Sequence, residues 1–192
     1  MSSLLLNIGL FQGCWLICVL GGANGLPWLG LFAAAAVVWA HLRAAPRPRR
    51  EALLITAAAA LGAFWDGQIA GHGWVAYTGG TPARWLPPLW IIAMWASFAT
   101  LLNRSLRFLH GRYGLALVTG GLLAPIAYAA GAALGAATFP DKTVAMLASG
   151  GGWALLLPVL VALAARWDGF AAAPYPTAAD AQRDSAETVR GV

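Results

Sequence analysis

One carboxylate in this sequence stands in unusual surroundings. The stretch AAAALGAFWDGQIAGHG, residues 57–73, carries no charge until Asp66, and Gln68 follows two positions later. Ala59, Gly62 and Asp66 recur at helical spacing, which forms a stripe of small side chains that lets a neighbouring backbone approach closely. An ionisable side chain in a transmembrane helix normally faces the bundle interior or a water-filled cavity. Asp66 is therefore a candidate for proton or substrate handling. The alternative is a structural Asp that is protonated, or bonded to a neighbouring helix, or hydrated because the helix ends sooner than predicted.

Other unusual residues fall at the same predicted membrane depth as Asp66. Counting about 1.5 Å per helical residue from the ends of the apolar segments places Tyr128 level with Asp66 and Trp90 close to it. The run SGGGW (149–153) interrupts another apolar segment at this depth, which indicates either a broken helix that lines a ligand cavity or a close helix contact. The candidate substrate-binding residues are Asp66, Gln68, Trp90, Tyr128, Gly150, Gly151 and Gly152.

A second set of polar residues lies toward the other membrane face. Thr100 and Asn103 share one helical stripe, Asn7 lies at a comparable depth, and Gln12 is nearer the middle of the membrane. Hydrogen bonds between transmembrane helices contribute about 0.6–1.7 kcal/mol each. We expect these four residues to make polar contacts between helices, with a second, inner polar site as the alternative.

Motifs for metal binding or catalysis are missing from the sequence. His41 and His110 fall at one predicted boundary and His72 at the other, so the three histidines do not predict a metal site. Cys14 and Cys18 share a helical face, which indicates small buried packing residues rather than a copper or redox pair. No GxSxG, HExxH or phosphate-binding glycine loop occurs. We expect no cofactor and no metal, and these absences favour a protein that is not an enzyme.

The composition places these residues in a membrane protein. Of 192 residues, 60% are hydrophobic and 10% are charged, with a mean hydropathy of +0.69. A soluble domain carries about 25% charged residues, and a chain of this size cannot hide so much apolar surface in one core. The net charge of +5 falls in short blocks between apolar runs rather than on a continuous basic face, which argues against nucleic-acid binding. The lipid bilayer is the expected partner.

Six apolar segments have the length of about 20 residues that crosses a bilayer. Their predicted bounds are 3–22, 26–42, 52–71, 86–103, 114–136 and 143–165. With a cytoplasmic N-terminus, ten arginines fall inside, and only Arg84 and Lys142 fall outside. This pattern predicts an all-α, polytopic bundle of six spans over residues 1–167, with both termini cytoplasmic. The segment 168–192 is polar and aperiodic, which predicts a disordered cytoplasmic tail.

Several segments carry a family resemblance. They are FQGCW (11–15), GLPWLG (25–30), the Asp66 segment, PPLWIIAMWASFATLLNRSLR (87–107), APIAYAAGAALGA (124–136) and GWALLLP (152–158). In this order they resemble a family of small bacterial inner-membrane proteins, the domain of unknown function 2878 family, over about residues 5–165. The resemblance implies a multi-pass protein, in some cases encoded near fatty-acyl-modifying enzymes, and so a lipid-linked role. It transfers no catalytic residue.

Three functions are open at this point. The first is an inner-membrane protein that binds or moves a hydrophobic or lipid-like molecule at the level of Asp66. The second is an accessory scaffold for a larger membrane or lipid-modifying enzyme, in which the polar residues only join helices. The third is an intramembrane enzyme with Asp66 as general base. The residues favour the first function. In addition to the bilayer, the expected partner is a lipid-like ligand or another membrane protein.

Overall fold

The computed structural model describes residues 2–171, and among them the chain forms six α-helices, one 3-10 helix and two short strands. The helices are α1 (Ser2–Ala23), α2 (Pro27–Ala44), α3 (Pro48–Gly71), α4 (Leu89–Leu102), α5 (Tyr113–Ala133) and α6 (Lys142–Arg166), with η1 (Arg107–Leu109) after α4. Strands β1 (Ala76–Tyr77) and β2 (Ala137–Thr138) lie in the loops before α4 and α6. The predicted all-α class is confirmed.

Local sequence signals explain where several helices begin. Pro27 and Pro48 occupy the first turn of α2 and α3, where the missing N–H has no helical partner. Asp141 precedes α6, and its side chain accepts hydrogen bonds from the backbone N–H of Thr143 at 2.8 Å and of Val144 at 3.1 Å. These bonds satisfy two of the amide groups that the first helical turn leaves free.

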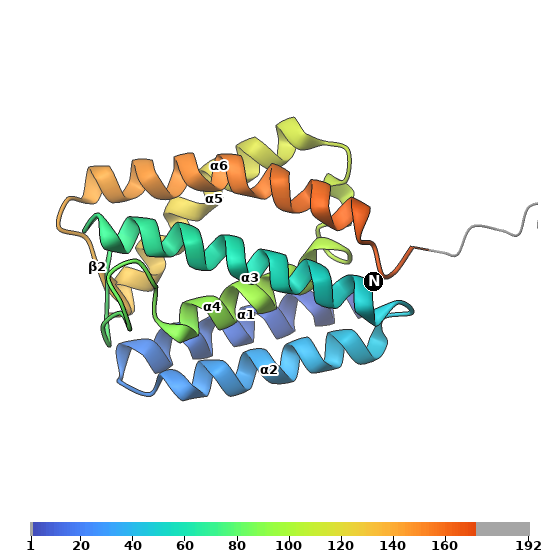
Figure 1. Cartoon of the computed structure of the whole chain (residues 1–192), viewed down its shortest axis with the longest axis horizontal. Helices are drawn as coiled ribbons and strands as arrows, with labels where there is room; N and C mark the ends of the chain where they lie inside the picture. Colours follow the sequence, from blue (N-terminus) through green and yellow to red (C-terminus); the bar gives the residue numbers. More distant parts are fainter. Residues whose placement is uncertain (1, 172–192) are drawn as a thin grey trace, which may run out of the picture.

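Successive helices run in opposite directions, so α1 begins and α6 ends at the same end of the bundle (Figure 1). We call this the terminal end; it also holds the loops 45–47 and 103–112. The opposite ribbon end holds the loops 24–26, 72–88 and 134–141. Most basic residues lie at the terminal end, where the described arginines are Arg43, Arg47, Arg49, Arg50, Arg104, Arg107, Arg112 and Arg166. Arg84 and Lys142 lie at the ribbon end.

Large apolar side chains cover the outside of the bundle. Phe32 and Leu147 are each 71% exposed, and Leu155 is 70% exposed. Five helices, α1, α2, α3, α5 and α6, are long and apolar enough to cross a membrane. Apolar surface on this scale is unfavourable in water and is the normal outer surface of a membrane bundle. The finding agrees with a multi-pass membrane protein.

Helix α4 differs from the other five because it is short and central. Its 14 residues rise about 21 Å, which is less than the roughly 30 Å of a bilayer core. It packs against α1, α2 and α3, and Trp90, Trp95 and Leu102 on it are buried. The predicted span 86–103 is therefore a shorter helix that other helices cover. Because Pro87 and Pro88 precede it, the chain at 86–88 is not helical.

A two-stranded ribbon joins two distant loops at the ribbon end. Strands β1 and β2 pair antiparallel, with Ala76 opposite Thr138 and Tyr77 opposite Ala137. The hydroxyl of Thr78 extends this pairing by donating to the carbonyl oxygen of Gly135 at 2.7 Å. This ribbon was not predicted from the sequence. The pairing of the two strands holds Tyr77, which lies outside every helix, at the ribbon end of the bundle.

Close glycine contacts set the spacing between helices. A Cβ atom on Gly62 of α3 would lie 2.1 Å from the Trp95 ring of α4. A Cβ atom on Gly30 of α2 would lie 2.9 Å from the Sγ atom of Cys18 on α1. Cys14 and Cys18 are free, buried thiols at this contact. The small-residue stripe through Gly62 therefore receives an indole ring, and the cysteines pack as small apolar residues.

Candidate functional site

An apolar cavity of about 650 Å³ opens between α1 and α5 and has further walls from α4 and α6. Its volume falls in the range of small-molecule sites, about 300–1,000 Å³. The side chains that line it are mostly aliphatic or aromatic, and they include Phe11, Trp15, Met94, Phe98, Leu123, Trp153 and Leu157. Gln12 lines it about halfway along, and Ser105 lies toward the terminal end.

The cavity follows the helices over about the depth of one membrane leaflet. On α5 its lining runs from Thr119 to Gly131, a rise of about 18 Å. A leaflet contributes about half of the roughly 30 Å hydrocarbon core. Leu123 and Ile126 line the cavity and are 58% and 63% exposed, so they form its rim on the lipid-facing surface of α5. A hydrocarbon chain in the bilayer therefore has direct sideways access.

Asp66 lies at the ribbon end of this cavity, where four elements meet. Its side chain is only 1% exposed, and it lines the cavity. The hydroxyl groups of Tyr77 on β1 and Tyr128 on α5 both donate to its Oδ1 atom, the latter at 2.6 Å. The indole N–H of Trp95 on α4 donates to Oδ2 at 2.5 Å. Asp66, Tyr77, Trp95 and Tyr128 form what we call the Asp66 cluster.

The hydrogen bonds of the cluster all point toward the carboxylate. Burial raises the pKa of the Tyr77 hydroxyl well above its ordinary value, and the nearby charge of Asp66 raises it further, so this phenol keeps its proton. Each phenol has one proton to donate and gives it to Asp66, so only its oxygen lone pairs remain for another group. Among residues 2–171, no arginine or lysine forms an ion pair with Asp66.

Aromatic rings surround the cluster. Trp95 and Trp153 stack with ring centroids 4.4 Å apart and an interplanar angle of 15°. Phe98 meets Trp153 edge to face at 5.1 Å, and Tyr77 meets Trp90 in the same way at 6.0 Å. The buried Nε1 atoms of Trp90 and Trp153 have no hydrogen-bond partner among the described residues. An unpaired buried donor costs about 1–3 kcal/mol, and Nε1 of Trp90 lies on the Gly22 side of the ring, where a Cβ atom on Gly22 would approach it to 2.9 Å.

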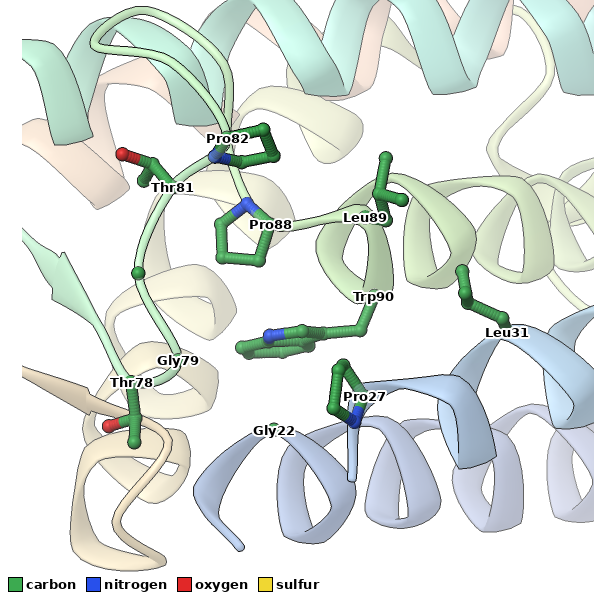
Figure 2. A pocket seen from close by; sticks show the side chains of 11 residues that line it. Gly22, Pro27, Leu31, Thr78, Gly79, Thr81, Pro82, Pro88, Leu89 and Trp90 are labelled. Atoms are coloured by element: carbon green, nitrogen blue, oxygen red, sulfur yellow. The ribbon is translucent and has the colours of Figure 1, made fainter. Parts of the chain in front are cut away.

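Trp90 also lines a second, smaller pocket on the ribbon end. This outer pocket has a volume of about 300 Å³ and lies between the α1–α2 turn and the loop 78–82. Figure 2 shows the Trp90 indole extending between Pro27 and Gly79. A Cβ atom on Gly22 would lie 2.7 Å from this ring, so glycine is required there. Trp90 is the wall between the apolar cavity and the outer pocket.

The predicted site residues divide into two groups. Tyr128 donates to Asp66, and Trp90 lines the cavity beside Tyr77. Gln68 does not line the cavity, and no hydrogen bond of its side chain occurs within residues 2–171. Two helical residues correspond to a rotation of about 200°, so Gln68 faces away from Asp66.

The triple glycine lies outside the cavity. Helix α6 continues unbroken through Gly150, Gly151 and Gly152, so the broken-helix interpretation is wrong. A Cβ atom on Gly152 would lie 2.0 Å from the Trp65 ring, and one on Gly150 would lie 3.0 Å from the carbonyl oxygen of Gly121. Gly152 thus lets α6 approach α3, and Gly150 lets it approach α5, which is the alternative that the sequence left open, whereas a Cβ atom on Gly151 would meet nothing within 4 Å.

Three residues of this site were not predicted from the sequence: Tyr77, Trp95 and Trp153. Tyr77 lies in a loop, and a depth count along apolar segments does not reach it. Trp95 had an indirect signal, because the stripe Ala59, Gly62 and Asp66 indicated that a neighbouring helix approaches closely. What the stripe did not reveal is that an indole occupies it and donates to Asp66.

A second buried carboxylate lies on α3 at the terminal end. Glu51 is fully buried, and its Oε2 atom pairs with Nε2 of His41 at 2.7 Å. Its Oε1 atom accepts from Nδ2 of Asn103 and from the backbone N–H of Gly169, both at 2.7 Å. Asn103 therefore makes a polar contact between helices, as expected, but its partner is Glu51, which was not predicted from the sequence.

The remaining polar residues join α1 to the chain around α4. Nδ2 of Asn7 donates to the carbonyl oxygen of Thr100 at 3.3 Å, and the hydroxyl of Ser105 donates to Oδ1 of Asn7 at 2.6 Å. The Thr100 hydroxyl donates within its own helix, to the carbonyl oxygen of Ser97. Gln12, by contrast, lines the apolar cavity. Asn7 and Thr100 therefore meet as interhelical contacts.

The start of the predicted tail packs against the bundle. Asp168 pairs with Arg107 at 2.6 Å, and the backbone of Gly169 bonds to Glu51 and Arg47. The Phe170 ring meets the His41 ring edge to face at 5.2 Å. The rest of the predicted tail, residues 172–192, lies outside the described residues.

Comparison with known proteins identifies the family. The chain belongs to the family described as "Protein of unknown function (DUF2878)", which matches residues 4–159. The family resemblance seen in the sequence is thereby confirmed. No curated protein and no solved structure matches the chain significantly.

Proposed function

We propose that this protein is a multi-pass inner-membrane protein that binds, or moves, a single-chain amphiphile in the cavity between α1 and α5. The hydrocarbon chain lies along the apolar walls, and the polar head group lies at the Asp66 cluster. The observation that carries this proposal is that the apolar cavity and the buried carboxylate of Asp66 belong to the same site. A lipid-accessible apolar cavity of about 650 Å³ ends at a buried carboxylate.

The chemistry of the cavity suits an amphiphile better than a purely apolar molecule. A hydrocarbon chain that moves from lipid into an apolar cavity gains little hydrophobic free energy, because both surroundings are apolar. Selectivity must then come from the polar end and from shape. The oxygen atoms of the Asp66 cluster supply that polar end.

Binding is favoured over general-base chemistry at Asp66. A general base needs a free lone pair within reach of the proton that it removes. Three donors already take three of the roughly four acceptor positions of the Asp66 carboxylate. The arrangement holds a charge in place, which is what a binding site requires.

The distribution of charge supports an orientation with both termini in the cytoplasm. The arginines gather at the terminal end, and the positive-inside rule assigns such an end to the cytoplasm. The short helix α4 then counts as the sixth crossing, because the chain direction alternates through it (Figure 1). The Asp66 cluster falls in the outer half of the membrane. A topology reporter inserted after residue 47 should be cytoplasmic, and an external reporter would overturn this orientation.

The binding proposal is tested by filling the cavity. Ala127 and Gly131 line it, and a Cβ atom on Gly131 meets nothing within 4 Å. The double variant Ala127→Phe, Gly131→Phe should reduce binding of a chain-brominated twelve-carbon amphiphile at least tenfold, measured in nanodiscs by quenching of tryptophan fluorescence. The matched control is Val118→Phe, Leu122→Phe on the same helix, where both residues are exposed and neither lines the cavity. Equal quenching in both variants and the wild type would refute the proposal.

A further inference from the structure

We infer that the amphiphile bound in this cavity carries a cationic head group, so that the site selects long-chain amines over alcohols and carboxylates. The inference rests on the proposed function and adds the chemical class of the ligand to it. Three independent features of the Asp66 cluster support it: the charge, the direction of the hydrogen bonds and the surrounding rings.

The charge of Asp66 has no counterpart among the described residues. A carboxylate in low-dielectric surroundings needs an opposite charge to offset its lost hydration. The basic residues nearest to the ribbon end are otherwise placed: Arg84 lies over the Trp85 ring, 5.0 Å from its centroid, and Lys142 begins α6. Neither forms an ion pair with Asp66. A positive head group would supply the missing charge.

The hydrogen-bond directions also favour a donor on the ligand. Tyr77 and Tyr128 donate their protons to Asp66, so they present oxygen lone pairs to any further group. A phenol that donates to a carboxylate becomes a better acceptor, because hydrogen bonds in a chain polarise one another. An ammonium N–H group fits these acceptors, whereas a carboxylate head group would meet lone pairs and a like charge.

The aromatic walls suit a cation as well. Trp95 is covered by the stacked Trp153 ring and by Gly62, whereas Tyr77 and Trp90 line the cavity on the ribbon-end side of the carboxylate. The faces of indole and phenol rings attract cations, and aromatic walls are the usual site of quaternary ammonium recognition.

The test uses three probes with one chain and different head groups. They are a primary amine, an alcohol and a carboxylate, each with twelve carbons and a bromine at the chain end. Binding is measured at neutral pH in nanodiscs of zwitterionic lipid by tryptophan quenching, with probe concentrations expressed per lipid. In the wild type we expect the amine to bind at least tenfold more tightly than the alcohol, and the carboxylate to bind most weakly.

The variant Asp66→Asn separates charge from shape. It should lose the preference for the amine while it still binds the alcohol within about threefold of the wild type. If this variant fails to fold, the three probes in the wild type decide the question alone. A fourth probe, the trimethylammonium form of the same chain, has the charge without an N–H donor and should also bind more tightly than the alcohol.

The outcomes distinguish this inference from the proposed function. Equal binding of amine and alcohol, tighter binding of the carboxylate, or an unchanged preference in Asp66→Asn overturns the cationic head group and leaves the cavity proposal standing. If no probe binds in a manner that the Ala127→Phe, Gly131→Phe variant abolishes, the proposed function itself fails.

Discussion

Helix α3 carries two buried carboxylates, each with three hydrogen-bond partners, that differ in the charge of those partners and in whether they face a cavity. Asp66 is 1% exposed and Glu51 is 0% exposed, and the 15 residues between them correspond to about 22 Å along the helix. Glu51 pairs with His41, accepts from two further donors and lines neither cavity. Asp66 accepts from neutral donors only and lines the larger cavity.

The difference separates a structural carboxylate from a binding one. Glu51 joins α2, α4 and the chain at Gly169, so its bonds hold parts of the fold that are far apart in sequence. Asp66 is also held by several elements, but its charge has no partner and faces a space of ligand size. A buried charge with complete partners stabilises a particular fold, while one with incomplete partners marks a place for a ligand.

The largest expected effect on stability is at Glu51. Replacement by alanine leaves His41, Asn103 and the backbone N–H of Gly169 without their buried acceptor. Breaking such a buried pair costs about 3–5 kcal/mol. Unfolding of Glu51→Ala in detergent, followed by circular dichroism, should show a loss of this size, and Asp66→Asn should lose less because the amide keeps the shape and an acceptor oxygen. A Glu51→Ala variant as stable as the wild type would remove the contrast between the two sites.

A smaller effect is expected where α3 meets α4. Gly62→Ala places a Cβ atom 2.1 Å from the Trp95 ring and must displace the indole that donates to Asp66. Overpacking of this kind costs about 1–3 kcal/mol. Thermal unfolding in detergent measures the loss, and the emission spectrum of the tryptophans should change with it.

Gly13→Ala on α1 is the control for Gly62→Ala. A Cβ atom at Gly13 meets nothing within 4 Å, and alanine is favoured over glycine in a helix by roughly 1 kcal/mol. Gly13→Ala should therefore be neutral or stabilising. If Gly62→Ala behaved in the same way, Trp95 would not be tightly packed against α3.

The smallest effect is expected at the ion pair between Arg107 and Asp168. The Arg107 side chain is 45% exposed, and pairs at the surface contribute about 0–1 kcal/mol. Arg107→Gln should lower the unfolding temperature only slightly, and less than Glu51→Ala does. A loss as large as that of Glu51→Ala would show that Asp168, rather than Glu51, holds the chain after α6 in place.

Much of the fold follows from local patterns in the sequence. The apolar segments predicted most helix ends to within a few residues, because lipid-facing helices must be apolar over their whole length. The third and fourth segments differed most in length. Helix α3 begins at Pro48, four residues before the predicted start. The fourth segment was predicted to start at residue 86 with Pro87 and Pro88 in its opening turn, and the helix begins only at Leu89.

The site was less accessible to such reasoning. Counting residues along helices placed Tyr128 level with Asp66, but depth alone does not say which way a side chain points, and Gln68 faces the wrong direction. Tyr77 reaches the site only because two loops pair as strands. The donor that Gly169 offers to Glu51 comes from 118 residues away, and no local pattern encodes such a contact.

The central claim is that the cavity between α1 and α5 holds a hydrocarbon chain, and photo-crosslinking in membranes tests it most directly. The probe is a twelve-carbon amine with a diazirine at the end of its chain. Because the head group is placed at the Asp66 cluster, the chain end should lie toward the terminal end of the cavity, and we predict that labelled peptides concentrate on the cavity faces of α1 and α5 around Phe11 and Thr119. Labelling there should disappear in the Ala127→Phe, Gly131→Phe variant. Labelling spread equally over lipid-facing residues elsewhere, such as Phe32 and Leu155, with no change in that variant, would contradict the account.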